Sequence, residues 1–288
     1  MKLGFYYIDL NKRLGEDFSE YEFDDNGVPL SRFHRLPGWK HNPITVCQYG
    51  LFHFNNYLRT SSSLSKDIFL SQANWLLEHA KDGPNKSAVW FYQFDLPFYD
   101  IKAPWISGMA QGQAISVLLR AFQISGEKKY LEAAQAAWRI FDVKVKDGGI
   151  ISEFPDGLPL IEEYPSSSKR SSVLNGFIFA IFGVYDYFVY LQDKDAQKKF
   201  HLFIESLKEN MFRYDSGYWS YYELANPRRL TAKFYHRIHI KQLESLFRIT
   251  NDPFFKQFAE RWQKYLFSPF SNFKWFLKKV HQKLVVQI

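Results

Sequence analysis

The sequence lacks most of the features that mark secreted, membrane-spanning and metal-cluster proteins. Its one cysteine, Cys47, excludes an intramolecular disulfide and any cysteine cluster for a metal. The apolar run at the start breaks at Asp9, too early for a signal peptide, and no stretch reaches the roughly 18 apolar residues of a spanning helix. No segment rich in Ser, Gly and Pro marks a linker. These absences predict a single-domain protein of the cytoplasm.

The composition favours an anionic partner. The net charge is +7, and aromatic residues make up 19% of the chain. Lysine and arginine are scattered except at the C-terminus, and no helix-turn-helix or RNA-binding signature is present, so we expect no nucleic-acid partner. An acidic polysaccharide would fit both the charge and the aromatic rings, which stack on sugar faces. For any single ring, however, a Phe-rich helical core is the more common explanation.

Two landmarks recur along the chain. Gly50, Gly112 and Gly176 are spaced by about 62 and about 64 residues, in amphipathic segments. Trp75 and Trp138 repeat at about 63 residues, and Trp262 follows at about twice that distance. Helix pairs at such a period must stack to bury their apolar faces. The repeat therefore predicts a mainly α fold, an incomplete (α/α) toroid of about four helix pairs with short β-hairpins at one end.

Turn and capping signals divide this repeat into elements. We expect an N-terminal arm over residues 1–43 that packs on the barrel, a catalytic (α/α) domain over 44–269, and a basic amphipathic helix over 270–288. Within the domain, the predicted elements are helices at 44–60 and 64–81, a hairpin-like run at 89–94, a helix entered by Pro104 whose partner ends near Phe141, a hairpin at 148–161, helices over 171–213, a hairpin at 217–223, and helices over 232–268.

Candidate chemical groups fall at hairpin ends and helix starts. Glu163 and Tyr164 follow the 148–161 hairpin, Tyr222 lies in the next hairpin position, and Tyr235 with His236 starts the last helix pair. In a toroid these positions converge on one mouth, where a carboxylate and several phenols would surround one sugar ring. His236 and His239 share a helix face, but the sequence offers no third ligand, so we expect no metal.

Three segments carry a resemblance to a known family: Trp105–Ser116, Glu162–Pro165 and Val173–Phe177. They resemble the D-glucuronyl C5-epimerases, which convert glucuronate to iduronate within heparosan-type polysaccharide, and the likeness extends over about residues 27–266. The resemblance implies an α/α barrel, a glucuronate-containing acidic polysaccharide as partner, and no cofactor. Inversion at C5 removes a proton alpha to a carboxylate and returns one from the opposite face, so two groups must flank the ring.

The resemblance also implies roles. Glu163 and Tyr235 become the leading acid/base pair, with Tyr164 and Tyr222 as auxiliary donors. The family places an arginine three residues after the tyrosine that Tyr222 matches, whereas this chain has Ala225, so a nearby arginine would have to bind the substrate carboxylate. The substrate-binding candidates are Gln48, Tyr49, Gln111, Gln113, Asn175, Arg228, Arg229, His236 and His239.

Several alternatives remain open at this level. A polysaccharide lyase would abstract the same proton and then expel the C4 substituent, and a non-catalytic protein would only bind the acidic glycan. The helix at 270–288 is either a membrane-surface helix, which would make the protein peripheral to the inner membrane face, or a cap on the repeat array. A homodimer is also compatible with the sequence.

Overall fold

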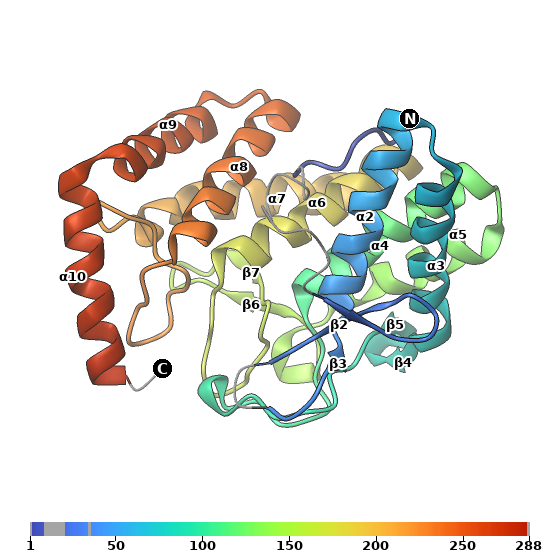
Figure 1. Ribbon diagram of the computed structural model, residues 1–288, viewed down its shortest axis with the longest axis horizontal. Coiled ribbons are helices and arrows are strands. Elements are labelled where there is room, and N and C mark those ends of the chain that lie inside the picture. Colours follow the sequence, from blue (N-terminus) through green and yellow to red (C-terminus); the bar gives the residue numbers. More distant parts are fainter. Residues whose placement is uncertain (1, 9–20, 34–35, 287–288) are drawn as a thin grey trace.

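The protein is built from four consecutive helix pairs, seen in a computed structural model that describes residues 2–8, 21–33 and 36–286 (Figure 1). The pairs are α2 (Pro43–Thr60) with α3 (Ser63–His79), α4 (Gly108–Ser125) with α5 (Lys128–Trp138), α6 (Leu174–Leu191) with α7 (Lys194–Asn210), and α8 (Lys233–Thr250) with α9 (Pro253–Phe267). Helix α10 (Pro269–Val286) follows the last pair along one side of the molecule. This arrangement confirms the mainly α toroid that the repeat predicts.

Glycines allow the inner helices α4 and α6 to touch through their backbones. A Cβ at Gly112 would lie 2.5 Å from the Cα of Ala180, and one at Gly183 would lie 2.2 Å from the carbonyl oxygen of Gly112. Only glycine fits such an approach. Helix α6 is long and apolar enough to cross a membrane by length and composition, so the prediction that no stretch reaches this length is wrong, but 78% of the stretch is buried inside the protein. It is the central helix of the core.

Short β-structure gathers at the end where the inner helices begin (Figure 1). Strands β1 (Glu22–Phe23), β2 (Pro29–Ser31) and β3 (Lys40–His41) form one antiparallel sheet, while β4 (Lys81–Gly83) pairs with β5 (Ser87–Val89) and β6 (Ile151–Glu153) with β7 (Pro159–Ile161). The predicted Asp-Gly turn between β6 and β7 is confirmed: Gly157 has a φ of +84°, and Asp156 accepts a hydrogen bond from the amide of Leu158 at 3.0 Å.

Two local predictions are wrong, and a third holds only in part. Helix α4 begins at Gly108 instead of Pro104, because Trp105 is held in a β-bridge to Tyr92 and Ser107 is the N-cap residue. The run at 89–94 is therefore split between β5 and that bridge. The predicted hairpin at 217–223 holds only in part: Asp215 pairs with Ser220 across a tight turn, but Tyr221 pairs with Leu230 and Glu223 with Val173. In each case a partner outside the predicted element competes with the local pattern.

The N-terminal arm lies in the seam between the first and last inner helices. The amide of Tyr6 donates to Asn55 of α2 at 2.7 Å, and the carbonyl of Tyr7 accepts from Arg248 of α8 at 3.0 Å. The hydroxyl of Tyr7 donates to Asp186 at 2.6 Å, and Asp186 forms a completely buried ion pair with Arg120 at 2.5 Å. Residues 2–8 thus pack on the barrel, whereas residues 9–20 of the predicted arm lie outside the described part.

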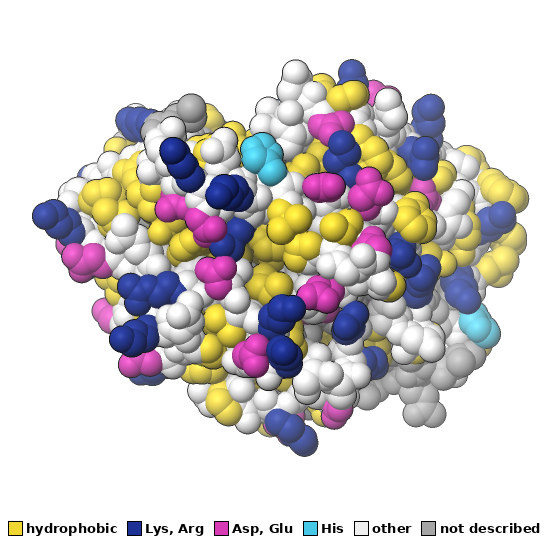
Figure 2. Space-filling model, turned by 180° about the vertical axis from the view of Figure 1, so that it is seen from behind, with side chains coloured by type: hydrophobic (Ala, Val, Ile, Leu, Met, Phe, Trp, Pro, Cys, Tyr) yellow, Lys and Arg dark blue, Asp and Glu magenta, His cyan; other side chains and the backbone are white. Residues whose placement is uncertain are grey.

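Charges of both signs are mixed over the rear face of the molecule. Figure 2 shows lysine and arginine side chains interspersed with aspartate and glutamate, with no single basic stripe across this face. The positive net charge is therefore dispersed there, as the sequence pattern predicts.

Candidate active site

Two helix N-termini hold the segment that follows the β6–β7 hairpin. The amide of Gly108 in α4 donates to the carbonyl oxygen of Glu162 at 2.9 Å, and a Cβ at Gly108 would lie 2.5 Å from that oxygen. In the first turn of α6, a Cβ at Gly176 would lie 2.3 Å from Oε2 of Glu163. Glycine at both positions lets the segment sit directly on the helix ends. The positive end of α6 stabilises a carboxylate there.

The two adjacent glutamates have different environments. Glu162 is buried and accepts hydrogen bonds from Ser152 Oγ at 2.9 Å, Ser171 Oγ at 2.7 Å and the amide of Ser172 at 2.8 Å. Burial raises its pKa, although these three donors act in the opposite direction. Glu162 therefore ties the hairpin to the loop before α6. Glu163, 4% exposed, faces a group of tyrosines.

That group, the tyrosine cluster, consists of Tyr99, Tyr164, Tyr222 and Tyr235. Tyr99 stacks on Tyr164 with ring centres 4.4 Å apart, Tyr164 is hydrogen-bonded to Tyr222, and the rings of Tyr222 and Tyr235 lie 5.1 Å apart. Burial, and then the nearby Glu163 carboxylate, raise the pKa of Tyr164 and of Tyr222 well above 10. Both phenols are therefore protonated at neutral pH and can donate protons or hydrogen bonds.

A buried ion pair adjoins the cluster. The Tyr99 hydroxyl donates to Oε2 of Glu223 at 2.6 Å, and Arg229 binds the other oxygen of Glu223 through Nε. Arg229 also donates to the Tyr99 hydroxyl at 2.8 Å, and its guanidinium carbon lies 5.5 Å from the ring centre of Tyr222. Sequence reasoning missed Tyr99 and gave Glu223 no role, because Tyr99 lies in an isolated 3₁₀ turn, Pro97–Tyr99, that carries no recognisable motif.

The two candidate arginines are separated by their environments. Arg228 is exposed, donates to the carbonyl oxygen of Arg213 at 3.4 Å, and lies over the ring of Tyr221. Arg229 points into the cluster. The structure therefore places Arg229, and not Arg228, next to the tyrosine cluster.

The two histidines are completely buried on α8. His236 donates through Nε2 to the carbonyl oxygen of Trp262 at 3.0 Å, so its Nδ1 is the acceptor for Ser220 Oγ at 2.8 Å. His239 Nδ1 bonds the same hydroxyl at 3.0 Å. Burial lowers the pKa of His236 to about 4 and that of His239 well below 6.5, so both imidazoles are neutral. They fix the segment just before Tyr222 and do not reach a surface that a polysaccharide could touch.

The predicted amides and Tyr49 are spread along the inner helices. Asn175 stands in the first turn of α6 beside Gly176, and its carbonyl oxygen accepts from Gln242 at 2.9 Å. Gln111 is buried and donates to the carbonyl oxygen of Ala88 at 3.0 Å. The remaining three candidates are Gln48, Tyr49 and Gln113; Gln48 and Gln113 are buried, and Tyr49 is half-buried against Phe23. Of this set, Asn175 is next to the helix end that receives Glu163.

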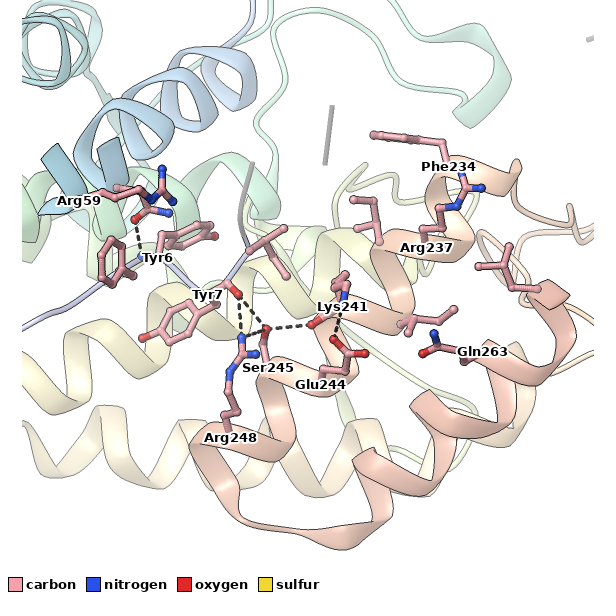
Figure 3. Close-up of a pocket in the computed structure, with 16 residues that line it drawn as sticks. Tyr6, Tyr7, Arg59, Phe234, Arg237, Lys241, Glu244, Ser245, Arg248 and Gln263 are labelled. Carbon is pink, nitrogen blue, oxygen red and sulfur yellow. Dashed lines mark hydrogen bonds and ion pairs between the residues drawn. The ribbon is translucent and has the colours of Figure 1, made fainter. Parts of the chain in front are cut away.

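A basic pocket of about 850 Å³ opens in the seam between α2 and α8 (Figure 3). Arg237, Lys241 and Arg248 line it along α8, facing Arg59 of α2, with Tyr6 and Tyr7 of the arm between them. Glu244 pairs with Lys241 at 2.8 Å. The pocket includes none of the four clustered tyrosines, but its lining residue Phe234 has its ring 5.2 Å from that of Tyr235. It approaches the tyrosine cluster at the start of α8.

Within residues 2–8, 21–33 and 36–286, no three His, Cys, Asp or Glu side chains are grouped closely enough to hold a metal ion. The chemistry available to the described part of the site is therefore that of one carboxylate, several protonated phenols and a paired guanidinium. Such a set can accept a proton on one side of a small ring and donate one from another.

Comparison with protein families gives a match to the D-glucuronyl C5-epimerase C-terminus over residues 84–264. A D-glucuronyl C5-epimerase of Caenorhabditis elegans is 31% identical over an alignment of 221 residues, and the match covers 69% of this chain and 35% of the worm protein. The chain thus spans about a third of that relative's length. An uncharacterised protein of Methanocaldococcus jannaschii is 28% identical over 72% of this chain and 67% of its own length.

The fold has solved counterparts. A GH76 α-mannanase of Bacteroides thetaiotaomicron superposes with a TM-score of 0.56 at 12% identity, covering 84% of this chain and 63% of the mannanase. At that identity the likeness concerns the fold alone.

Proposed function

The chain belongs to the D-glucuronyl C5-epimerase C-terminal family, and from that membership we propose that it inverts C5 of D-glucuronyl residues in a heparosan-like acidic polysaccharide. The observation that carries the proposal is the Glu163 carboxylate, seated on the N-terminus of α6 and facing protonated phenols. A carboxylate can accept a proton at neutral pH, and a phenol is protonated there and can donate one.

In the proposed reaction Glu163 and Tyr235 act from opposite faces of the sugar. Glu163 takes the C5 proton, the electron pair of that C–H bond passes into the substrate carboxylate as an enolate, and Tyr235 returns a proton to the other face of C5. Proton exchange with water resets both groups. Tyr164 and Tyr222 donate hydrogen bonds to the enolate oxygens, where developing negative charge needs stabilising donors.

Arg229 is the proposed source of positive charge for the substrate carboxylate. It lies beside Tyr222, takes the place of the arginine that Ala225 fails to supply, and keeps its position through Glu223 and Tyr99. The basic pocket along α8 supports an anionic polymer as the substrate. From Phe234 to Arg248 it follows about 21 Å of helix, at about 1.5 Å per residue, which leaves room for several sugar rings.

The test is proton NMR of heparosan and of its N-sulfated form in heavy water. We expect loss of the C5 proton signal, new iduronate resonances and unchanged chain length. Glu163→Gln and Tyr235→Phe should each reduce exchange by about 10²–10⁴-fold, the range for removing a general acid or base. Tyr221→Phe is the matched control for Tyr222→Phe, because Tyr221 packs under Arg228 outside the cluster and should leave the rate unchanged.

Other outcomes select among the alternatives. Shortening of the polymer together with absorbance from an unsaturated uronate would show that the protein is a lyase that uses the same base, and not an epimerase. If both polymers bind tightly without proton exchange, and Glu163→Gln does not change their affinity, the protein would be a non-catalytic glycan-binding protein. Arg229→Gln should raise the KM much more than Arg228→Gln does, and equal effects would remove Arg229 from its proposed role.

A further inference from the structure

Helix α10 turns an apolar stripe away from the protein. Six of its large apolar side chains are between 41% and 77% exposed: Phe270, Phe273, Phe276, Leu277, Val280 and Leu284. At about 100° per residue they fall within an arc of about 120° and extend over about 21 Å of helix. A contiguous exposed apolar surface of this kind marks an interaction site.

The opposite face of α10 is fastened to the body of the protein. Trp275 Nε1 donates to the carbonyl oxygen of Thr231 at 2.8 Å, Lys279 Nζ to that of Leu230 at 3.2 Å, and Gln282 Nε2 to that of Arg228 at 3.1 Å. Trp275 also packs on Trp219 with ring centres 5.5 Å apart. These contacts fix the rotation of the helix, so the stripe cannot turn inward without breaking them.

The charge of α10 is of one sign. The sequence from Pro269 to Val286 contains lysines and no Asp or Glu. Lys274 and Lys278 are exposed and lie along one edge of the stripe, and Nζ of Lys274 is 4.3 Å from the ring centre of Phe270. A partner for this surface must therefore be apolar at its centre and anionic at its edge.

We propose that α10 lies flat in the surface of a membrane that contains anionic lipids, with the apolar stripe among the acyl chains and Lys274 and Lys278 at the headgroups. In-plane amphipathic helices combine these same two features. A second copy of the chain is a poorer fit, because pairing two acid-free stripes would bring their lysines together without a carboxylate between them. Because α10 is bonded to residues 228–231, docking would hold the loop that carries Arg229 close to the membrane.

Co-sedimentation of the full chain with vesicles tests this surface. We expect binding to phosphatidylcholine vesicles that contain phosphatidylglycerol, weaker binding at high salt, and little binding to phosphatidylcholine alone. Phe273→Ser with Phe276→Ser should weaken binding to the anionic vesicles by about tenfold or more, and so should Lys274→Gln with Lys278→Gln.

Two matched controls separate the stripe from general surface effects. Leu64 and Phe212 are 67% and 63% exposed on other elements, and their double serine variant should bind like the wild type. Lys194 and Lys198 on α7 are exposed with the same four-residue spacing as the α10 pair, and their double glutamine variant should also be unaffected. Thermal melts of all four variants should match that of the wild type.

Three results would overturn the proposal: no binding of the wild type to anionic vesicles, equal losses in the α10 and control variants, or a stripe-dependent dimer in analytical ultracentrifugation without vesicle binding. The last would assign the stripe to a second copy of the chain.

Discussion

Replacing Gly176 by alanine tests the placement of Glu163 without altering any chemical group of the site. Alanine is favoured over glycine within a helix by about 1 kcal/mol, so the substitution should by itself strengthen the first turns of α6. The added methyl group, however, would lie 2.3 Å from Oε2 and 2.6 Å from Cβ of Glu163. The Glu163 carboxylate must therefore move, even though alanine stabilises the helix itself.

The size of that movement sets the expected effect. Ordinary contacts to a Cβ begin at 3.4 Å, so the carboxylate has to shift by about 1 Å, and the Cβ contact prevents a rotation of the side-chain end from relieving the clash. A displacement of about 1 Å costs about 10²-fold in rate, or about 2.7 kcal/mol of transition-state stabilisation. Overpacking costs about 1–3 kcal/mol of stability, partly offset by the helix preference, so Tm should fall by a few degrees only.

The assay is the rate of C5 proton exchange in heavy water, measured beside a thermal melt. Gly50→Ala is the matched control, because Gly50 is its counterpart in α2 and an added Cβ would meet Gln72 at 3.1 Å and Phe69 at 3.6 Å instead of Glu163. We expect full exchange activity for this control and about one hundredth of it for Gly176→Ala. A Gly176→Ala variant that folds and retains full activity would show that the reaction does not depend on the position of Glu163, and the proposed base would have to be abandoned.

Further predictions concern ionisation and stability. Glu163→Gln should lower the pKa of Tyr222 in a spectroscopic phenolate titration, because burial and then the Glu163 charge raise that pKa. An unchanged Tyr222 pKa would show that the Glu163 charge does not act on this phenol. His236 should make the free energy of unfolding fall by about 3 kcal/mol as the pH drops from about 6.5 to about 4, because in this range the imidazole takes up a proton in the unfolded chain but not in the folded one. In urea titrations, His236→Gln should reduce this pH dependence. Arg120→Met should cost about 3–5 kcal/mol in the same measurement because it leaves the Asp186 charge buried, and adding Asp186→Leu should recover much of that loss; equal stability of the two variants would contradict this account.

Much of the architecture could be predicted from local patterns. The recurring glycines do lie on the inner helices α2, α4 and α6, and the recurring tryptophans lie on the outer helices α3, α5 and α9. The four helix pairs follow from periodicity and capping, with outer ends within about three residues except at the start of α4, because these signals depend on neighbours three or four residues away. The convergence of the segments that carry Glu163, Tyr222 and Tyr235 then follows from stacking the pairs in order.

The sequence by itself therefore determined the toroid and the end of it at which the chemical groups gather. Only the tertiary structure decided which groups meet there. Tyr99 bonds Glu223 across 124 residues, Arg229 joins them while Arg228 turns away, and His236 is drawn into the interior between tryptophans. Contacts over such separations depend on how the closed ring packs, because side chains adjacent in sequence point to different surfaces and no local pattern records which surface becomes the site.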